Sequence, residues 1–219
     1  MASATDKIAR TYGREYVADT RDRHYRLRTR RTTRKYRYWR CGQVTDQGAA
    51  PNCVGHAWAN WLAASPVRQR PIAPDGIYTL AQYHDEWEGQ DYEGTSVRGA
   101  AKVLTITGHI SEYRWEWRLT PAIEYLLVSG PLVLGVNWYE GMEEPDLKGV
   151  IHADGRLLGG HAVLCYGANC STQLVSIRNS WGRGWGDNGN CRISFADLDQ
   201  LLSEDGECCA AVESQPSAQ

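Results

Sequence analysis

The apolar positions between residues 53 and 129 recur with the spacing of an α-helix. In the segment CVGHAWANWLAAS, residues 53–65, apolar side chains stand at positions i, i+3, i+4, i+7 and i+8, and Pro66 ends the pattern. The same spacing predicts three further helices, within residues 74–87, 95–108 and 121–129. In the last of these, Thr120 is the expected N-cap and Pro121 the first helical residue.

After residue 130 the pattern changes to short runs rich in Val, Leu and Ile, separated by Gly, Asn and Asp. These runs predict β-strands in PLVLGVNW, HAVLCYG, QLVSIRN and NCRISF. Helices that precede strands along the chain predict an α+β protein with a helical lobe and a β lobe. A cleft between such lobes is the natural place for a functional site.

The length of 219 residues is sufficient for one compact unit. We expect a basic N-terminal arm over residues 1–38 and a folded domain over 39–212, with the helical lobe at about 53–129 and the β lobe at about 130–212. Residues 213–219 are expected to form a flexible tail.

Charge is distributed unevenly along the chain. Residues 1–40 contain 13 Lys or Arg and 4 acidic residues, whereas the remaining residues contain 11 and 22. Basic arms of this kind can bind nucleic acid, but no nucleic-acid-binding module accompanies this one. Tyr, Leu and Trp residues are interleaved with the arginines, so we expect the arm to lie along its own acidic body and expect no nucleic-acid partner. The acidic body favours basic substrates.

Cys53 stands at the predicted start of a helix, where the helix dipole favours the thiolate form of its side chain. A cysteine nucleophile also needs a base, and that base needs a group to orient it. His56 moves with Cys53 on one helix, and His84 lies on the apolar stripe of another helix and is expected to pack. His161 follows two glycines at the start of a strand, and Asn179, 18 residues later, can accept its second N–H.

Several motifs in the chain resemble those of the papain-like cysteine peptidases. Gln47 stands six residues before Cys53, the segment HAV begins at His161, and NSWGRGWGDNG, residues 179–189, fits a long and specific family pattern. The resemblance implies that Cys53 is the nucleophile and His161 the general base and acid. It also implies that Asn179 orients His161 and that Gln47 contributes to the oxyanion hole. The implied fold has a helical left lobe and an antiparallel β-barrel-like right lobe, with the active-site cleft between them.

The resemblance also suggests where a substrate binds. Gly94 and Gly160 match positions that receive the substrate backbone, and Trp138 and Trp181 are expected beside the same cleft, with Trp181 covering the hydrogen bond between His161 and Asn179. Many family members have a cysteine and a tryptophan where this chain has Ala50 and Val54. The surrounding segment is closer to the bacterial branch of the family.

The sequence therefore predicts a cysteine endopeptidase with a protein or peptide substrate. Two alternatives remain open: a papain-fold acyltransferase or transglutaminase-like enzyme, and a non-catalytic papain-fold binding module. We expect no metal, because no pair of cysteines has the spacing of a zinc site, and no cofactor. No segment predicts a signal peptide or a transmembrane helix, so we expect a cytoplasmic monomer without a membrane partner. The pairing of Cys41, Cys170, Cys208 and Cys209 is left open.

Overall fold

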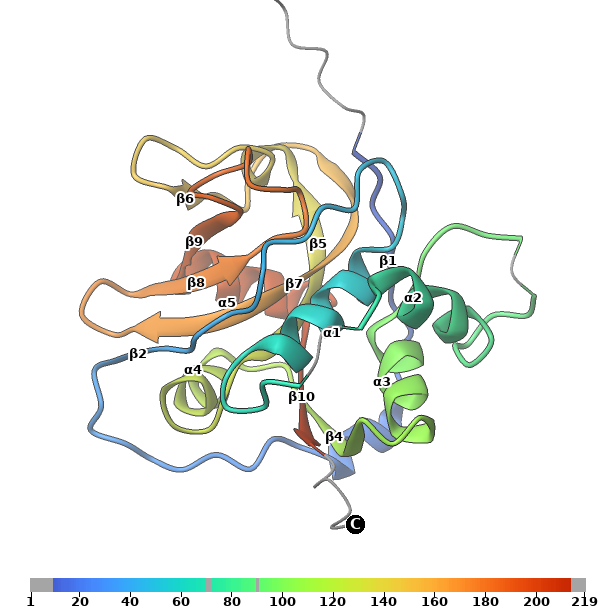
Figure 1. The fold of residues 1–219 in the computed structure, drawn as a ribbon. Coiled ribbons are helices and arrows are strands. Elements are labelled where there is room, and N and C mark those ends of the chain that lie inside the picture. Colours follow the sequence, from blue (N-terminus) through green and yellow to red (C-terminus); the bar gives the residue numbers. More distant parts are fainter. Residues whose placement is uncertain (1–9, 70–71, 90, 214–219) are drawn as a thin grey trace, which may run out of the picture.

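The structure is a computed structural model that describes residues 10–69, 72–89 and 91–213. Three helices lie on one side of the molecule, and a sheet with two more helices lies on the other (Figure 1). The helices are α1 (Cys53–Ala63), α2 (Pro74–Gln82), α3 (Val97–Ile106), α4 (Leu119–Val128) and α5 (Phe195–Ser203). Two short 3₁₀ helices are η1 (Thr20–His24) and η2 (Glu140–Met142).

The main sheet has eight strands in the order β4-β10-β5-β7-β8-β9-β6, with β2 pairing at β7. Its strands are β2 (Tyr36–Tyr38), β4 (Ile110–Glu116), β5 (Leu132–Tyr139), β6 (Val150–Ile151), β7 (Leu157–Asn169), β8 (Leu174–Arg178), β9 (Asn190–Ser194) and β10 (Glu207–Glu213). A second, two-stranded sheet joins β1 (Arg14–Glu15) to β3 (Thr95–Ser96) in parallel.

The predicted α+β class with two lobes is confirmed. The β lobe is mostly antiparallel, but β6 and β9 run parallel, and the strands of the described residues do not close into a barrel. Apolar side chains form two separate buried clusters, one around α1 and α3 and one within the β lobe.

Helix α1 is buried on almost every side because it lies between β7 and the helices α2 and α3. Its two tryptophans keep their indole N–H groups satisfied. Trp58 donates to the carbonyl of Val97 at 3.1 Å, and Trp61 donates to the carbonyl of Pro131 at 3.0 Å. The helix is therefore fixed to both lobes, which holds its first residue, Cys53, at their boundary.

Two details of the predicted helices are wrong. Helix α2 ends at Gln82, so His84 lies beyond it and is exposed instead of packed. Helix α4 begins two residues earlier than expected, at Leu119, with Arg118 as N-cap in place of Thr120. Its buried residues, which include Ala122 and Leu126, join the core of the β lobe.

The seven cysteines are all free. Cys165 and Cys191 are buried within the β-lobe core as small apolar side chains, as expected.

Candidate active site

Cys53 is the first residue of α1, and its side chain faces strand β7. The backbone of Ala162, the residue after His161, is close enough to the Cys53 sulfur to act on the pKa of the thiol. Because α1 belongs to one lobe and β7 to the other, the sulfur lies at the boundary of the two. The fold thus brings Cys53 beside a strand that is more than a hundred residues away in the sequence.

His161 is held by contacts on several sides. Its Nε2 lies 2.8 Å from Oδ1 of Asn179, and its Nδ1 is buried with no hydrogen-bond partner among the described residues. The Trp181 ring stacks on the imidazole with 4.9 Å between ring centroids, and Trp138 meets it edge-on at 4.7 Å. The ring is therefore fixed in orientation with Nδ1 free to exchange a proton.

Gln47 is fixed by Ser180, a neighbour of Asn179. The hydroxyl of Ser180 donates to Oε1 of Gln47 at 2.6 Å, and the backbone N–H of Gln47 donates to the carbonyl of Ser180 at 2.8 Å. The remaining polar atom, Nε2, donates to the carbonyls of Ala50 and Thr11. Sequence analysis missed Ser180, although its position inside the motif NSWGRGWGDNG was a signal.

Residues 10–15 of the N-terminal arm, which include strand β1 and are here called the cleft segment, contact this site. The carbonyl of Thr11 accepts from Gln47 at 3.1 Å, and the Tyr12 ring lies 6.1 Å from that of His161. The backbone of Gly13 is close enough to the Cys53 sulfur to act on the pKa of the thiol. Cys53 and His161 are each 0% exposed. No motif in the sequence predicts that the arm reaches the cleft.

Gly94 and Gly160, predicted to receive a substrate backbone, receive the cleft segment. The N–H of Thr95, beside Gly94, donates to the carbonyl of Gly13 at 3.0 Å. A side chain on Gly160 would overlap the carbonyl of Arg14. These glycines therefore leave room for a second chain to lie against the cleft wall.

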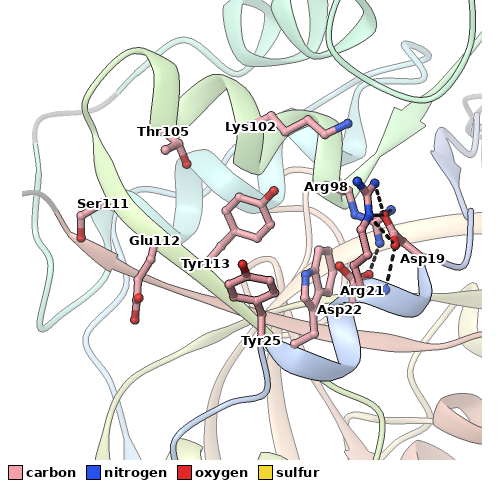
Figure 2. Close-up of a pocket in the computed structure, with 11 residues that line it drawn as sticks. Asp19, Arg21, Asp22, Tyr25, Arg98, Lys102, Thr105, Ser111, Glu112 and Tyr113 are labelled. Atoms are coloured by element: carbon pink, nitrogen blue, oxygen red, sulfur yellow. Dashed lines mark hydrogen bonds and ion pairs between the residues drawn. The ribbon is translucent and has the colours of Figure 1, made fainter.

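Ion pairs attach the arm at both ends of the cleft and beyond it. Arg10 pairs with Glu143 and Glu144 and lies 4.1 Å from the Trp181 ring, and Arg14 pairs with Glu207. Further along, Arg98 on α3 faces Asp19 and Asp22 of the arm, as Figure 2 shows. The described part of the arm lies along the body, as the charge distribution predicts.

The pKa of the Cys53 thiol is shifted in the direction opposite to the one expected. Burial raises the pKa of Cys53 to about 11, although hydrogen bonds from the backbone of Ala162, Gly13 and Val54 act to lower it. Burial likewise lowers the pKa of His161 to about 4, against the opposing effect of Asn179. The expectation that the helix dipole favours the thiolate is therefore wrong for this structure, because water cannot solvate the buried charge.

Trp138 and His56, both considered in the sequence analysis, are buried. Trp138 is 0% exposed, packs in the β-lobe core and meets the His161 ring edge-on. His56 is buried on α1, and burial lowers its pKa to about 4. Its Nδ1 has no partner among the described residues.

The described residues contain no group of three or more His, Cys, Asp or Glu side chains arranged to hold a metal ion. Within the same residues, none of the helices combines the length and apolar character needed to cross a membrane.

Comparison with known proteins identifies the family. Residues 39–210 match the model of the papain family cysteine protease. An uncharacterised peptidase C1-like protein of Acanthamoeba polyphaga mimivirus is 23% identical over 208 residues, which covers 73% of this chain and 67% of that protein. Cathepsin B-like cysteine proteinase 6 of Caenorhabditis elegans is 34% identical over 83 residues, 37% of this chain and 22% of that protein.

Among solved structures, xylellain, a cysteine protease from Xylella fastidiosa, superimposes with a TM-score of 0.78 at 18% identity, covering 98% of this chain and 100% of that one. The bromelain protease of Ananas comosus superimposes with a TM-score of 0.62 at 13% identity, covering 82% and 99% of the two chains. At these identities the likeness concerns the fold. The chain belongs to the papain family of cysteine proteases.

Proposed function

We propose that this protein is a cysteine endopeptidase that hydrolyses protein or peptide substrates through a thioester on Cys53. The observation that carries the proposal is the hydrogen bond of 2.8 Å between His161 and Asn179 on one side of the cleft, beside the sulfur of Cys53 on the other. The match of residues 39–210 to the papain family supports it.

In the first step, Cys53 transfers its proton to Nδ1 of His161, and the sulfur attacks the carbonyl carbon of the substrate amide. Asn179 holds Nε2 of the ring, which leaves Nδ1 as the atom that exchanges protons. When a substrate displaces Thr11, the Nε2 hydrogen of Gln47 that donates to the Thr11 carbonyl becomes available, and with the backbone N–H of Cys53 it is suited to stabilise the negative oxygen that forms.

The intermediate collapses when its C–N bond breaks and His161 gives its proton to the leaving amine. The acyl group remains on the Cys53 sulfur. Water then attacks the thioester, His161 accepts a proton from that water, and the C–S bond breaks. The thiol regains its proton, so the enzyme returns to its starting form.

We also propose a cellular compartment for the protein and a role for its N-terminal arm. Seven free cysteines support a reducing compartment, and we propose the cytoplasm. The ion pairs of Arg10, Arg14 and Arg26 with acidic residues of the body support a role of the arm within the molecule in place of nucleic-acid binding.

Labelling by an electrophilic epoxide, followed by peptide mapping, tests the proposal. The cleft segment covers Cys53, so the assay uses the full chain with Tyr12→Ala and Arg14→Ala. We expect modification of Cys53 alone among the seven cysteines, together with hydrolysis of a casein substrate, and loss of both with His161→Ala. Cys41→Ser, at a partly buried cysteine outside the cleft, serves as the matched control.

Absence of both labelling and hydrolysis would contradict the proposal. An amine trap separates the alternatives. Conjugation of the acyl group to the amine at low amine concentration, without hydrolysis, would favour an acyltransferase.

A further inference from the structure

Four arginines line a cavity that lies apart from the active site. Arg40 follows β2, Arg68 lies beyond the end of α1, Arg178 is the last residue of β8, and Arg183 belongs to the loop between β8 and β9. The cavity has a volume of about 420 Å³, which is in the range of small-molecule sites. No acidic side chain is among its described lining residues. The lining is therefore strongly positive.

The four arginines lack acidic partners. After residue 40 the chain has more acidic than basic residues, so partners are plentiful in this part of the protein. Even so, none of the four lies within ion-pair distance of a described acidic side chain. Among the described arginines after residue 40, Arg192 is the only other one without such a partner. The unpaired arginines of the body thus gather at this cavity, where they repel one another unless an anion enters.

Arg178 is held in a fixed orientation at the cavity. The side chain is half-buried, its Nε donates to Oδ1 of Asn190 at 2.7 Å, and its Nη1 donates to the carbonyl of Gly42 at 3.2 Å. Its Nη2 donates to no other described residue. A guanidinium that is already anchored through two of its nitrogens loses little further freedom when an anion binds to the third.

Helix α1 separates this cavity from the nucleophile. Ala63, the last residue of α1, lines the cavity, whereas Cys53 is the first residue of the same helix. At a rise of 1.5 Å per residue, the two ends of α1 are about 15 Å apart. None of the proposed catalytic residues is in the lining. A ligand bound here is therefore not a substrate lying in the cleft.

The lining favours a compact polyanion. Guanidinium groups pair with phosphate oxygens through parallel charge-assisted hydrogen bonds. Four uncompensated positive charges in one cavity are best matched by a ligand that concentrates several negative charges in a small volume, as linked phosphate groups do. No aromatic side chain is among the described lining residues, so the cavity offers no stacking surface for a ring.

We propose that this cavity binds a soluble oligophosphate, an anion of two or more linked phosphate groups, with Arg178 as its fixed donor and Arg40, Arg68 and Arg183 as its exposed partners. The inference does not depend on the proposed peptidase function, because it concerns binding away from Cys53. It rests on the grouping of these arginines, on their lack of acidic partners and on the anchored guanidinium of Arg178.

Calorimetric titration of the full chain with sodium tripolyphosphate tests the binding. The titration is run at about 0.15 M NaCl, where salt screens distant exposed charges. Arg40→Gln with Arg183→Gln should weaken binding about tenfold or more, because two charge-assisted contacts are lost.

Arg30→Gln with Arg31→Gln is the matched control. It removes the same charge from two exposed arginines of the arm that are not in the lining, and it should change the affinity about twofold or less. An equal loss of affinity in the two double variants would overturn the inference, because it would show that net charge alone attracts the anion.

Cys41 reports occupancy of the cavity itself. It is a partly buried cysteine in the lining, and Cys170 is a partly buried cysteine outside it. Alkylation by N-ethylmaleimide with peptide mapping gives the rate at each thiol. Saturating tripolyphosphate should slow labelling of Cys41 about fivefold or more and leave Cys170 unchanged, because the anion blocks access and disfavours the thiolate. Unchanged labelling of Cys41 would overturn the inference, even if the anion binds elsewhere on the chain.

Citrate separates recognition of phosphate from attraction of any small polyanion. At the same ionic strength, citrate should bind about tenfold more weakly than tripolyphosphate, because its three carboxylates carry less charge than the linked phosphates. Equal affinity for the two anions would overturn the assignment of the ligand class. Tripolyphosphate binding in a protein that shows no hydrolysis would support the cavity and contradict the peptidase proposal alone.

Discussion

The side-chain amide of Gln47 donates to the carbonyl of Thr11 at 3.1 Å, so a residue of the arm occupies the donor that we propose for the oxyanion. The same segment leaves Cys53 with no exposed surface. A substrate must therefore displace residues 10–15 before the sulfur can react.

Substitutions that remove contacts between the cleft segment and the rest of the protein are expected to expose the thiol of Cys53. In the full chain, Tyr12→Ala with Arg14→Ala should increase the rate of Cys53 labelling by an epoxide about tenfold or more, because a buried ion pair and an aromatic contact with His161 are lost. Time-resolved mass spectrometry measures the rate. Arg21→Ala, at an arm side chain that is 84% exposed, should have little effect. Equal rates in all three proteins would show that the cleft segment does not limit access.

Removing the side-chain amide of Asn179, the hydrogen-bond partner of His161, is expected to slow catalysis. Asn179→Ala should lower kcat about tenfold or more, because the ring loses its orientation and the hydrogen bond that raises the pKa of His161. Asn179→Asp keeps an acceptor oxygen and should retain more activity, with a pH–rate profile shifted to higher pH by the added negative charge. Steady-state kinetics in the Tyr12→Ala, Arg14→Ala background measure both effects. Identical kcat values for the two Asn179 variants would argue against an orienting role.

Acid is expected to release the cleft segment. In the closed form the pKa of His161 lies at about 4, below its ordinary value of 6.5, because burial disfavours the imidazolium. Opening the cleft hydrates the ring, so the protonated form favours the open state. The His161 contribution to closure is therefore present above pH 6.5 and is lost as the pH falls toward 4. Arg10 and His56 act in the same direction by disfavouring a further positive charge on His161.

Hydrogen exchange of the amides in residues 10–15, corrected for intrinsic rates, measures this release. Protection should decrease between pH 7 and pH 4. His161→Gln removes the titrating imidazole and should reduce the change. Protection that increases on acidification would contradict the assignment.

A helix cap in the β lobe offers a prediction about stability. Ser194 is the N-cap of α5: its hydroxyl accepts from the N–H of Asp197 at 3.0 Å and donates to the carboxylate of Asp197 at 2.6 Å. Ser194→Ala should lower the free energy of unfolding by about 1 kcal/mol. Urea denaturation measures the change, and Ser203→Ala, at an exposed position near the end of the same helix, is the control. Equal stability of the two variants would refute the cap's contribution.

The local pattern was sufficient to predict the helices around Cys53 and the strand at His161. Side-chain periodicity records which face of an element is buried, and it identified α1, α3 and β5 within a few residues. Strands β4 and β10 were not predicted. Their pairing joins residues about one hundred positions apart, and the charged side chains of β4 interrupt any clear apolar pattern.

The sequence by itself identified the family and predicted Gln47, Cys53, His161 and Asn179 as the candidate site, because each of these residues lies in a short motif that can be recognised locally. Only the tertiary structure decided that residues 10–15 fill the cleft, that Arg14 reaches Glu207, and that the thiol pKa is raised in place of lowered. These properties depend on which segments, distant in the sequence, pack together and exclude water. Solvent exclusion is a consequence of packing in three dimensions, and no spacing along the chain encodes it.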